Sequence, residues 1–176
     1  NSMENVNTNF TISFWMLKKG SLTNNVRYVL TKDDGGSTNV EYQVATYGRA
    51  IRLYLYDGAT ANEALYTTNQ SFLANNTTAW EHITITFEKS TGLVTFHRNG
   101  GSALTSVADD TQTWSAAFAD LDSDFDNMHN TSTNLGISNQ GTLGTDGFKG
   151  HLAHVVIFKH DGQSGIGTSV LTVSQV

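Results

Sequence analysis

One segment of the chain concentrates acidic side chains at alternate positions, and these residues are Asp120, Asp122, Asp124 and Asp126. Calcium takes about six to eight oxygen ligands, and carboxylates that alternate along an extended segment can converge on one ion. The segment does not continue as an EF-hand loop, because Asn127 and Thr133 stand where such a loop needs glycine and glutamate. Calcium is therefore a candidate ligand and not a required cofactor, and a solvated acidic loop is the alternative.

A second group of residues has the chemistry of a sugar-binding surface. Arg52, Tyr54 and Tyr56 alternate along one predicted strand and share the face opposite its aliphatic residues. Sugars present flat C–H faces that stack on aromatic rings, while polar side chains bind their hydroxyl groups. We expect Tyr42 on the preceding strand and Trp114 in a long loop to complete a carbohydrate site. The alternative is that these rings cover the outer face of a sheet or pack under the loop.

The histidines and a search for catalytic motifs give weaker indications of function than these two groups of residues. His82 and His97 lie on the two strands of a predicted hairpin and can approach each other. Paired histidines on a polar strand face are usually just exposed, so we do not expect zinc there. The sequence contains no nucleophile elbow, phosphate loop, metalloprotease helix or dinucleotide fingerprint. We therefore predict that the protein is not an enzyme.

The composition narrows the class of protein. The 176 residues include no Cys and no Pro, and 10 basic against 16 acidic residues give a net charge of −6. Disulfides and thiolate metal sites are excluded, and an acidic chain is a poor candidate for binding nucleic acid. No apolar run approaches the roughly 18 to 20 residues of a membrane span, so we expect no membrane insertion. A surface rich in Thr, Asn, Ser and Gly is common in β-rich proteins that work outside cells.

Apolar residues recur with a period of two, which predicts strands with one wet face. Phe10, Ile12, Phe14 and Met16, for example, share one face. We predict strands at 10–16, 26–31, 41–46, 49–57, 82–88, 93–99, 134–138 and 151–159. Short helical turns are expected at 115–121 and 170–176, and residues 102–133 read as loop with one further strand at most. Short strands separated by turns predict a single all-β domain over 1–176, an antiparallel sandwich of two packed sheets.

Five segments, in order, resemble the motifs of laminin G-like jelly rolls of the concanavalin A-like lectin and glucanase superfamily. They are Phe-Thr-Ile-Ser-Phe-Trp at 10–15, the strand at 80–87, the hairpin at 91–100, Leu-Gly-Ile at 135–137 and the strand at 148–158. The resemblance implies a concanavalin A-like sandwich. Glucanases of this fold carry a Glu-x-Asp-x-Glu strand motif, and none of the five glutamates here stands in one.

The chain departs from the family pattern at Ala153, where an acidic residue is usual, and at Val156, where a basic one is usual. The first family strand and the closing helix and strand look cut short. We therefore expect an open sheet edge that is completed by another copy or a neighbouring subunit, because an unpaired edge is an aggregation hazard. Family members from animals often carry a disulfide, so a chain without cysteine looks more like a microbial or viral surface protein.

These observations predict a non-catalytic glycan-binding or adhesive module of a larger extracellular or surface protein. Its expected partner is a glycan or surface polysaccharide, and its expected location is the cell exterior, a cell surface or a virion surface. The alternative is a structural or assembly domain of a virion, fibre or appendage, which interacts by packing and not by sugar capture.

Overall fold

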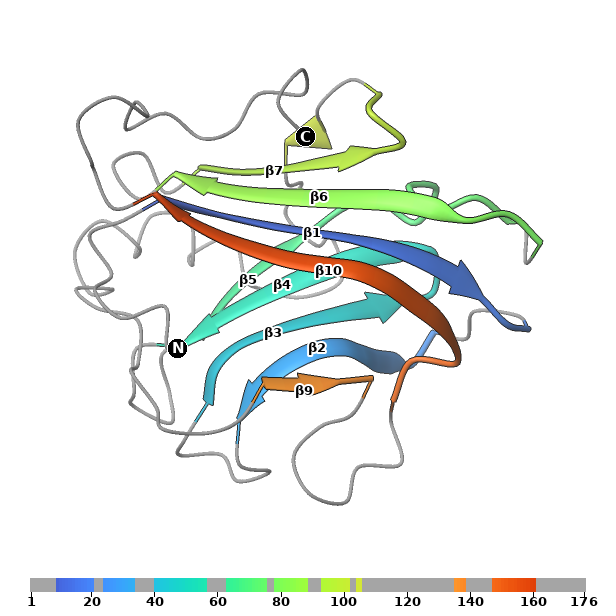
Figure 1. The fold of residues 1–176 in the computed structure, drawn as a ribbon, viewed down its shortest axis with the longest axis horizontal. Coiled ribbons are helices and arrows are strands. Elements are labelled where there is room, and N and C mark those ends of the chain that lie inside the picture. The colour runs from blue at the N-terminus through green and yellow to red at the C-terminus, as the bar shows by residue number, and fades with distance from the viewer. Residues whose placement is uncertain are drawn as a thin grey trace.

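A computed structural model describes residues 9–20, 24–33, 40–56, 63–75, 78–88, 93–101, 104–105, 135–138 and 147–160. These residues form ten β-strands and no helix, and the strands make two five-stranded sheets. Every strand pair within the two sheets is antiparallel. The predicted all-β antiparallel sandwich is confirmed (Figure 1).

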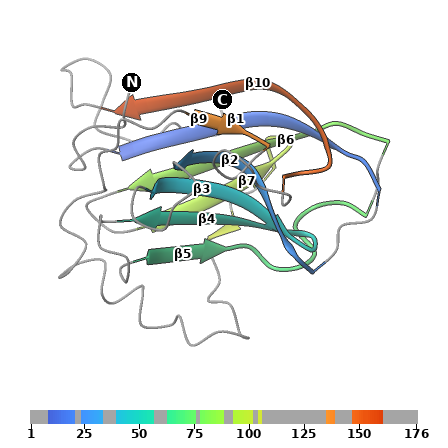
Figure 2. The same ribbon diagram turned by 90° about the horizontal axis from the view of Figure 1, so that it is seen from below.

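The two sheets are named here sheet A and sheet B. Sheet A has the order β10 (Gly150–His160), β1 (Asn9–Lys18), β6 (Glu81–Glu88), β7 (Leu93–Arg98) and β8 (Leu104–Thr105). Sheet B has the order β5 (Glu63–Thr67), β4 (Ala50–Tyr56), β3 (Val40–Tyr47), β2 (Val26–Asp33) and β9 (Leu135–Ile137). The terminal strands β9 and β10 lie at the same end of the two sheets, opposite β5 (Figure 2).

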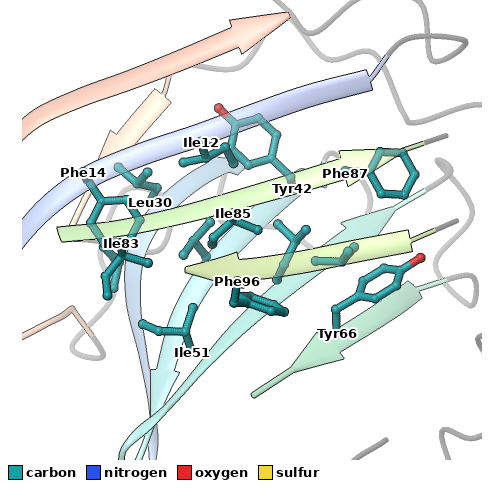
Figure 3. Close-up of a cluster of buried hydrophobic side chains, with 14 of the residues drawn as sticks. Ile12, Phe14, Leu30, Tyr42, Ile51, Tyr66, Ile83, Ile85, Phe87 and Phe96 are labelled. Atoms are coloured by element: carbon teal, nitrogen blue, oxygen red, sulfur yellow. The ribbon is translucent and has the colours of Figure 1, made fainter. Parts of the chain in front are cut away.

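The core lies between the sheets and takes alternate side chains from β1, β3, β4, β6 and β7. β1 contributes Phe10, Ile12, Phe14 and Met16, all of them buried. These meet residues of β6 and β7 in the same sheet and residues of β2, β3, β4 and β5 from sheet B (Figure 3). The alternation in the sequence is therefore the cause of the layered core, because burial of one face per strand requires a period of two.

Two differences from the sequence-based strands matter. β5 was not predicted, because its five residues follow a turn-rich stretch and are too few to show a clear alternation. β10 and β1 are out of step at one point, where a register shift falls between Ser13 and Trp15 and His154 takes a positive φ of 49°. The expected helical turns at 115–121 and 170–176 lie outside the described residues.

Candidate ligand-binding surface

Three of the sequence-predicted sugar-binding residues share the outer face of sheet B, but they are packed against one another. Arg52 and Tyr54 are only 3% and 8% exposed. The Arg52 guanidinium lies 3.9 Å from the centre of the Tyr47 ring, and its Nη1 donates a hydrogen bond to the Tyr54 hydroxyl at 3.3 Å. The Tyr56 hydroxyl donates to the Gln43 side chain at 3.1 Å. Little of the Tyr54 ring is thus open for a sugar to stack on.

Tyr42 does not join this face, and the expectation that it would was wrong. Across the β3–β4 pair, Tyr42 stands opposite Leu55, and Gln43 stands opposite Tyr54. Tyr42 therefore points into the core, where it is 2% exposed, and burial raises the pKa of its hydroxyl well above the usual value, with a smaller effect from the charge of Glu41. Trp114 and the acidic residues Asp120, Asp122, Asp124 and Asp126 lie outside the described residues.

The exposed aromatic rings among the described residues are on the other sheet. Trp15 is 39% exposed and Trp80 is 41% exposed. Trp15 lies between the inward-facing Phe14 and Met16 on β1, so it projects from the outer face of sheet A. Trp80 directly precedes β6, whose first residue Glu81 pairs with Met16. Partly exposed tryptophan side chains present apolar ring area at the surface, and a ligand can stack on that area.

A histidine stands beside each of these rings. Trp15 and His82 are register partners on β1 and β6, and their ring centres are 4.9 Å apart with an interplanar angle of 36°. The ring centres of Trp80 and His151 are 6.5 Å apart, with an interplanar angle of 45°. We call Trp15, Trp80, His82 and His151 the tryptophan surface. It draws its residues from β1, β6, the turn before β6, and β10.

His82 has a fixed environment. One hydrogen bond of 2.8 Å joins its Nε2 to the Ser13 hydroxyl on the neighbouring strand. Partial burial lowers the pKa of the imidazole below its ordinary value. The lowered pKa favours the neutral ring, which has one donor and one acceptor nitrogen, and Nε2 is the one already bonded to Ser13. Neutral donors and acceptors of this kind suit sugar hydroxyl groups.

A buried ion pair anchors the strand end that carries Trp80. Lys18 Nζ lies 2.8 Å from Glu81 Oε2, and both side chains are almost fully buried. The other carboxylate oxygen of Glu81 accepts the Ala74 backbone N–H at 2.9 Å and lies 3.7 Å from Arg98 Nη1. The start of β6 is thereby tied to β1, to β7 and to the turn at Ala74, which limits how far Trp80 can move.

Metal binding finds no support within the described part of the chain. No group of three or more His, Asp or Glu side chains there is arranged to hold an ion. His97 lies opposite Thr84, diagonally across from His82, and its Nδ1 approaches the Gly101 carbonyl oxygen at 3.2 Å.

The described segments contain no helix of the length and hydrophobicity that a membrane span requires.

Sequence reasoning overlooked the tryptophan surface, although one signal for it was present. The alternation that places Phe14 and Met16 inside also places Trp15 outside, where its ring can contact a ligand. The pairing of Trp15 with His82 was not visible, because the two residues, at positions 15 and 82, are far apart in the sequence.

No family model and no curated protein matches the chain. Solved structures do share its fold. The CBM40 of the Ruminococcus gnavus IT-sialidase, bound to α2,3-sialyllactose, matches with a TM-score of 0.52 and 9% identity over 95% of this chain and 79% of that one. A botulinum neurotoxin type C structure matches with a TM-score of 0.54 and 12% identity over 87% of this chain.

Domains LG4-5 of the mouse laminin α1 chain match with a TM-score of 0.51 and 9% identity over 85% of this chain and 34% of that one. The chain spans about a third of the toxin chain, of which it covers 32%. At these identities the likeness shows the fold alone. The comparisons therefore support the laminin G-like resemblance only as far as the jelly-roll fold.

Proposed function

We propose that this chain is a non-catalytic glycan-binding module that works outside the cell or on a surface, and that the sugar stacks on the tryptophan surface. The observation that carries the proposal is the pair of tryptophans on one sheet face, 39% and 41% exposed, each with a histidine beside it. Sugar rings offer C–H faces to indole rings, while imidazole groups exchange hydrogen bonds with the sugar hydroxyls.

Two structural neighbours support a glycan as the ligand. The R. gnavus CBM40 is bound to sialyllactose, and cell entry of botulinum neurotoxin type C depends on interaction with two ganglioside molecules. Both ligands contain sugars, and both proteins share the jelly-roll fold of this chain. Because one fold hosts many functions, the neighbours support only the class of ligand. The location of the binding site has to be inferred from the side chains of this chain.

The sheet B face is the weaker place for this function. Arg52 and Tyr54 on this face are buried against their neighbours, so a sugar could stack on Tyr54 only after the contacts of Arg52 with Tyr47 and Tyr54 were broken. The tryptophan surface needs no such rearrangement. Calcium is not required by any contact of this surface, and an effect of calcium would point instead to the acidic segment.

A glycan array probed with the full chain, with calcium and with a chelator, tests the proposal. We expect binding to a subset of glycans in both conditions, at affinities that ring stacking supports, with Kd of about 1 mM or tighter. Hits are then titrated by calorimetry against the double variant Trp15→Ala/Trp80→Ala. No binding to any glycan, or equal binding by the double variant, would overturn the proposal.

A structural or assembly role is the alternative function, and one observation favours it. The strands that end the two sheets, β9 and β10, carry exposed apolar side chains. This second role uses β9 and the second half of β10, whereas the tryptophan surface takes only His151 from the start of β10.

A further inference from the structure

Exposed apolar side chains gather at one end of the sandwich. Seven large apolar residues are exposed among the described residues, and four of them lie on β9 and β10. These four are Leu135 (43% exposed), Ile137 (55%), Val156 (39%) and Phe158 (45%). The two strands end their sheets on the same side (Figure 2). Single exposed apolar residues are ordinary, but a group of them marks an interaction surface.

Further apolar residues that are not fully buried lie on the inner face of β10. Leu152, Val155 and Ile157 point toward the core, yet they are only partly buried against it. Core-facing aliphatic residues that are only partly buried indicate that, among the described residues, no strand closes the sandwich beyond β10. A partner that covers β10 would complete their burial.

β10 is also an edge strand. Within the described part of the chain it pairs only with β1, over 11 residues. Natural edge strands are usually protected by proline, by charges in the middle of the strand, or by bulges. The register shift of β10 lies at its first half, and its second half runs in regular register, from Val156 opposite Ser13 to Phe158 opposite Thr11. That regular half has an apolar run at its centre.

We propose that the second half of β10 pairs antiparallel with β10 of a second copy of this chain, about a two-fold axis at Ile157. In this register Val156 stands opposite the partner's Phe158, and Phe158 stands opposite the partner's Val156. Ile157 stands opposite the partner's Ile157. At these three positions apolar residues meet apolar residues on both faces, while Val155 stands opposite the partner's Lys159. The centre of the strand is therefore its own complement, as an isologous dimer requires.

The alternation of the strand restricts the register to axes that pair inward side chains with inward ones, and the axis at Ile157 keeps the central pairs within the regular half of β10, beyond His154. A shift by one residue would pair an outward side chain with an inward one, which a continuous sheet does not allow. Pairing about Ile157 joins the two copies of sheet A into one sheet and brings the two β9 strands to the same junction. Leu135 and Ile137 would then add to the contact beneath the joined sheet.

The dimer has a consequence for ligand binding, and this part rests on the proposed function. A two-fold axis perpendicular to the sheet keeps both outer faces on the same side. The two tryptophan surfaces would face one way, so a polysaccharide or a surface coated with glycans could engage both. Paired sites raise avidity by about 10²-fold or more without a new contact.

Sedimentation velocity over a concentration series of the full chain tests the dimer. We expect a reversible monomer–dimer equilibrium, weakened about tenfold or more by Phe158→Lys, because the new ammonium would face an apolar side chain across the junction. Leu93→Lys is the matched control, since Leu93 is 40% exposed on β7, away from β10, and should leave the equilibrium unchanged. Circular dichroism checks that each variant is folded.

Thiol crosslinking gives an independent readout. The chain has no cysteine, so Ile157→Cys introduces a single thiol. Opposed residues of an antiparallel pair have Cα atoms about 4.5 to 5.5 Å apart, within the range of a disulfide. We expect oxidised Ile157→Cys to form a covalent dimer and Leu93→Cys to stay monomeric.

A wild-type chain that is monomeric up to about 1 mM would overturn the proposal, and so would a dimer that Phe158→Lys leaves intact and Ile157→Cys fails to trap. A monomer that still binds glycan would remove the dimer and leave the proposed function standing.

Discussion

Truncation of the exposed tryptophans should weaken glycan binding by a predictable amount. A tryptophan side chain offers about 250 Å² of surface at most. With 39% of Trp15 and 41% of Trp80 exposed, about 100 Å² of each lies open to a ligand. One sugar ring covers about half of that area, or about 50 Å², because it contacts one side of the indole.

At about 25 cal/mol per Å², each contact contributes about 1.2 kcal/mol. Trp15→Ala and Trp80→Ala should therefore each raise the Kd about eightfold, and the double variant about sixtyfold if the two contacts add. Trp15→Phe and Trp80→Phe should keep most of the affinity, because a phenyl ring still stacks. Calorimetric titration with the strongest glycan from an array measures all five variants.

Leu93→Ala provides the control. Leu93 lies on the same outer face and is 40% exposed, but it is aliphatic and stands at the far end of β7. Its truncation should leave the Kd within about twofold of wild type. If both tryptophan-to-alanine variants bind as tightly as wild type while folded, stacking at this surface is refuted.

Three further predictions concern two residues beside the tryptophan surface, Glu81 and His82, and one residue of sheet B, Tyr56. Glu81→Ala should lower the free energy of unfolding by about 3 to 5 kcal/mol in urea titrations, because Lys18 would keep a buried charge without its carboxylate; a loss under about 1 kcal/mol would contradict the pairing. Stability should fall as the pH drops below about 6.5, since the unfolded His82 takes up a proton before the folded one, whose pKa is lowered; His82→Gln should reduce this dependence, and an unchanged pH profile would count against it. Tyr56→Phe should cost about 1 kcal/mol of stability through its lost hydrogen bond to Gln43 and leave glycan affinity unchanged; lost affinity would point to sheet B.

The fold could be predicted because each strand carries its own signal. Phe10, Ile12, Phe14 and Met16 are core residues for a reason that is local, the period of two along one strand. β5 escaped because a five-residue strand shows too few repeats of that period. Strand existence is thus readable from the sequence wherever the strand is long enough to repeat its pattern.

The site could not be predicted in the same way, because it depends on pairing between strands. Tyr42 and Gln43 are neighbours in the sequence, and only the β3–β4 register decides which of them stands opposite Tyr54. A slip of one residue exchanges the two faces. The contact of Trp15 with His82 likewise arises from the β1–β6 register and has no local signature.

The partner of the sheet edge remains a prediction from the family pattern. Within the described residues, β10 pairs only with β1 and carries the exposed side chains of Val156 and Phe158. That another copy completes this edge stays a prediction, and the crosslink at Ile157 is its sharpest test.

The central claim is that sugar stacks on Trp15 and Trp80, and the indole N–H signals of the protein test it most directly. The chain has three tryptophans, Trp15, Trp80 and Trp114, so a ¹⁵N-correlated NMR spectrum contains three such signals, assignable by single Trp→Phe variants. On titration with the strongest glycan hit, we predict that the Trp15 and Trp80 signals shift together along one binding curve. A shift confined to Trp114, or no indole shift at saturating glycan, would contradict the claim.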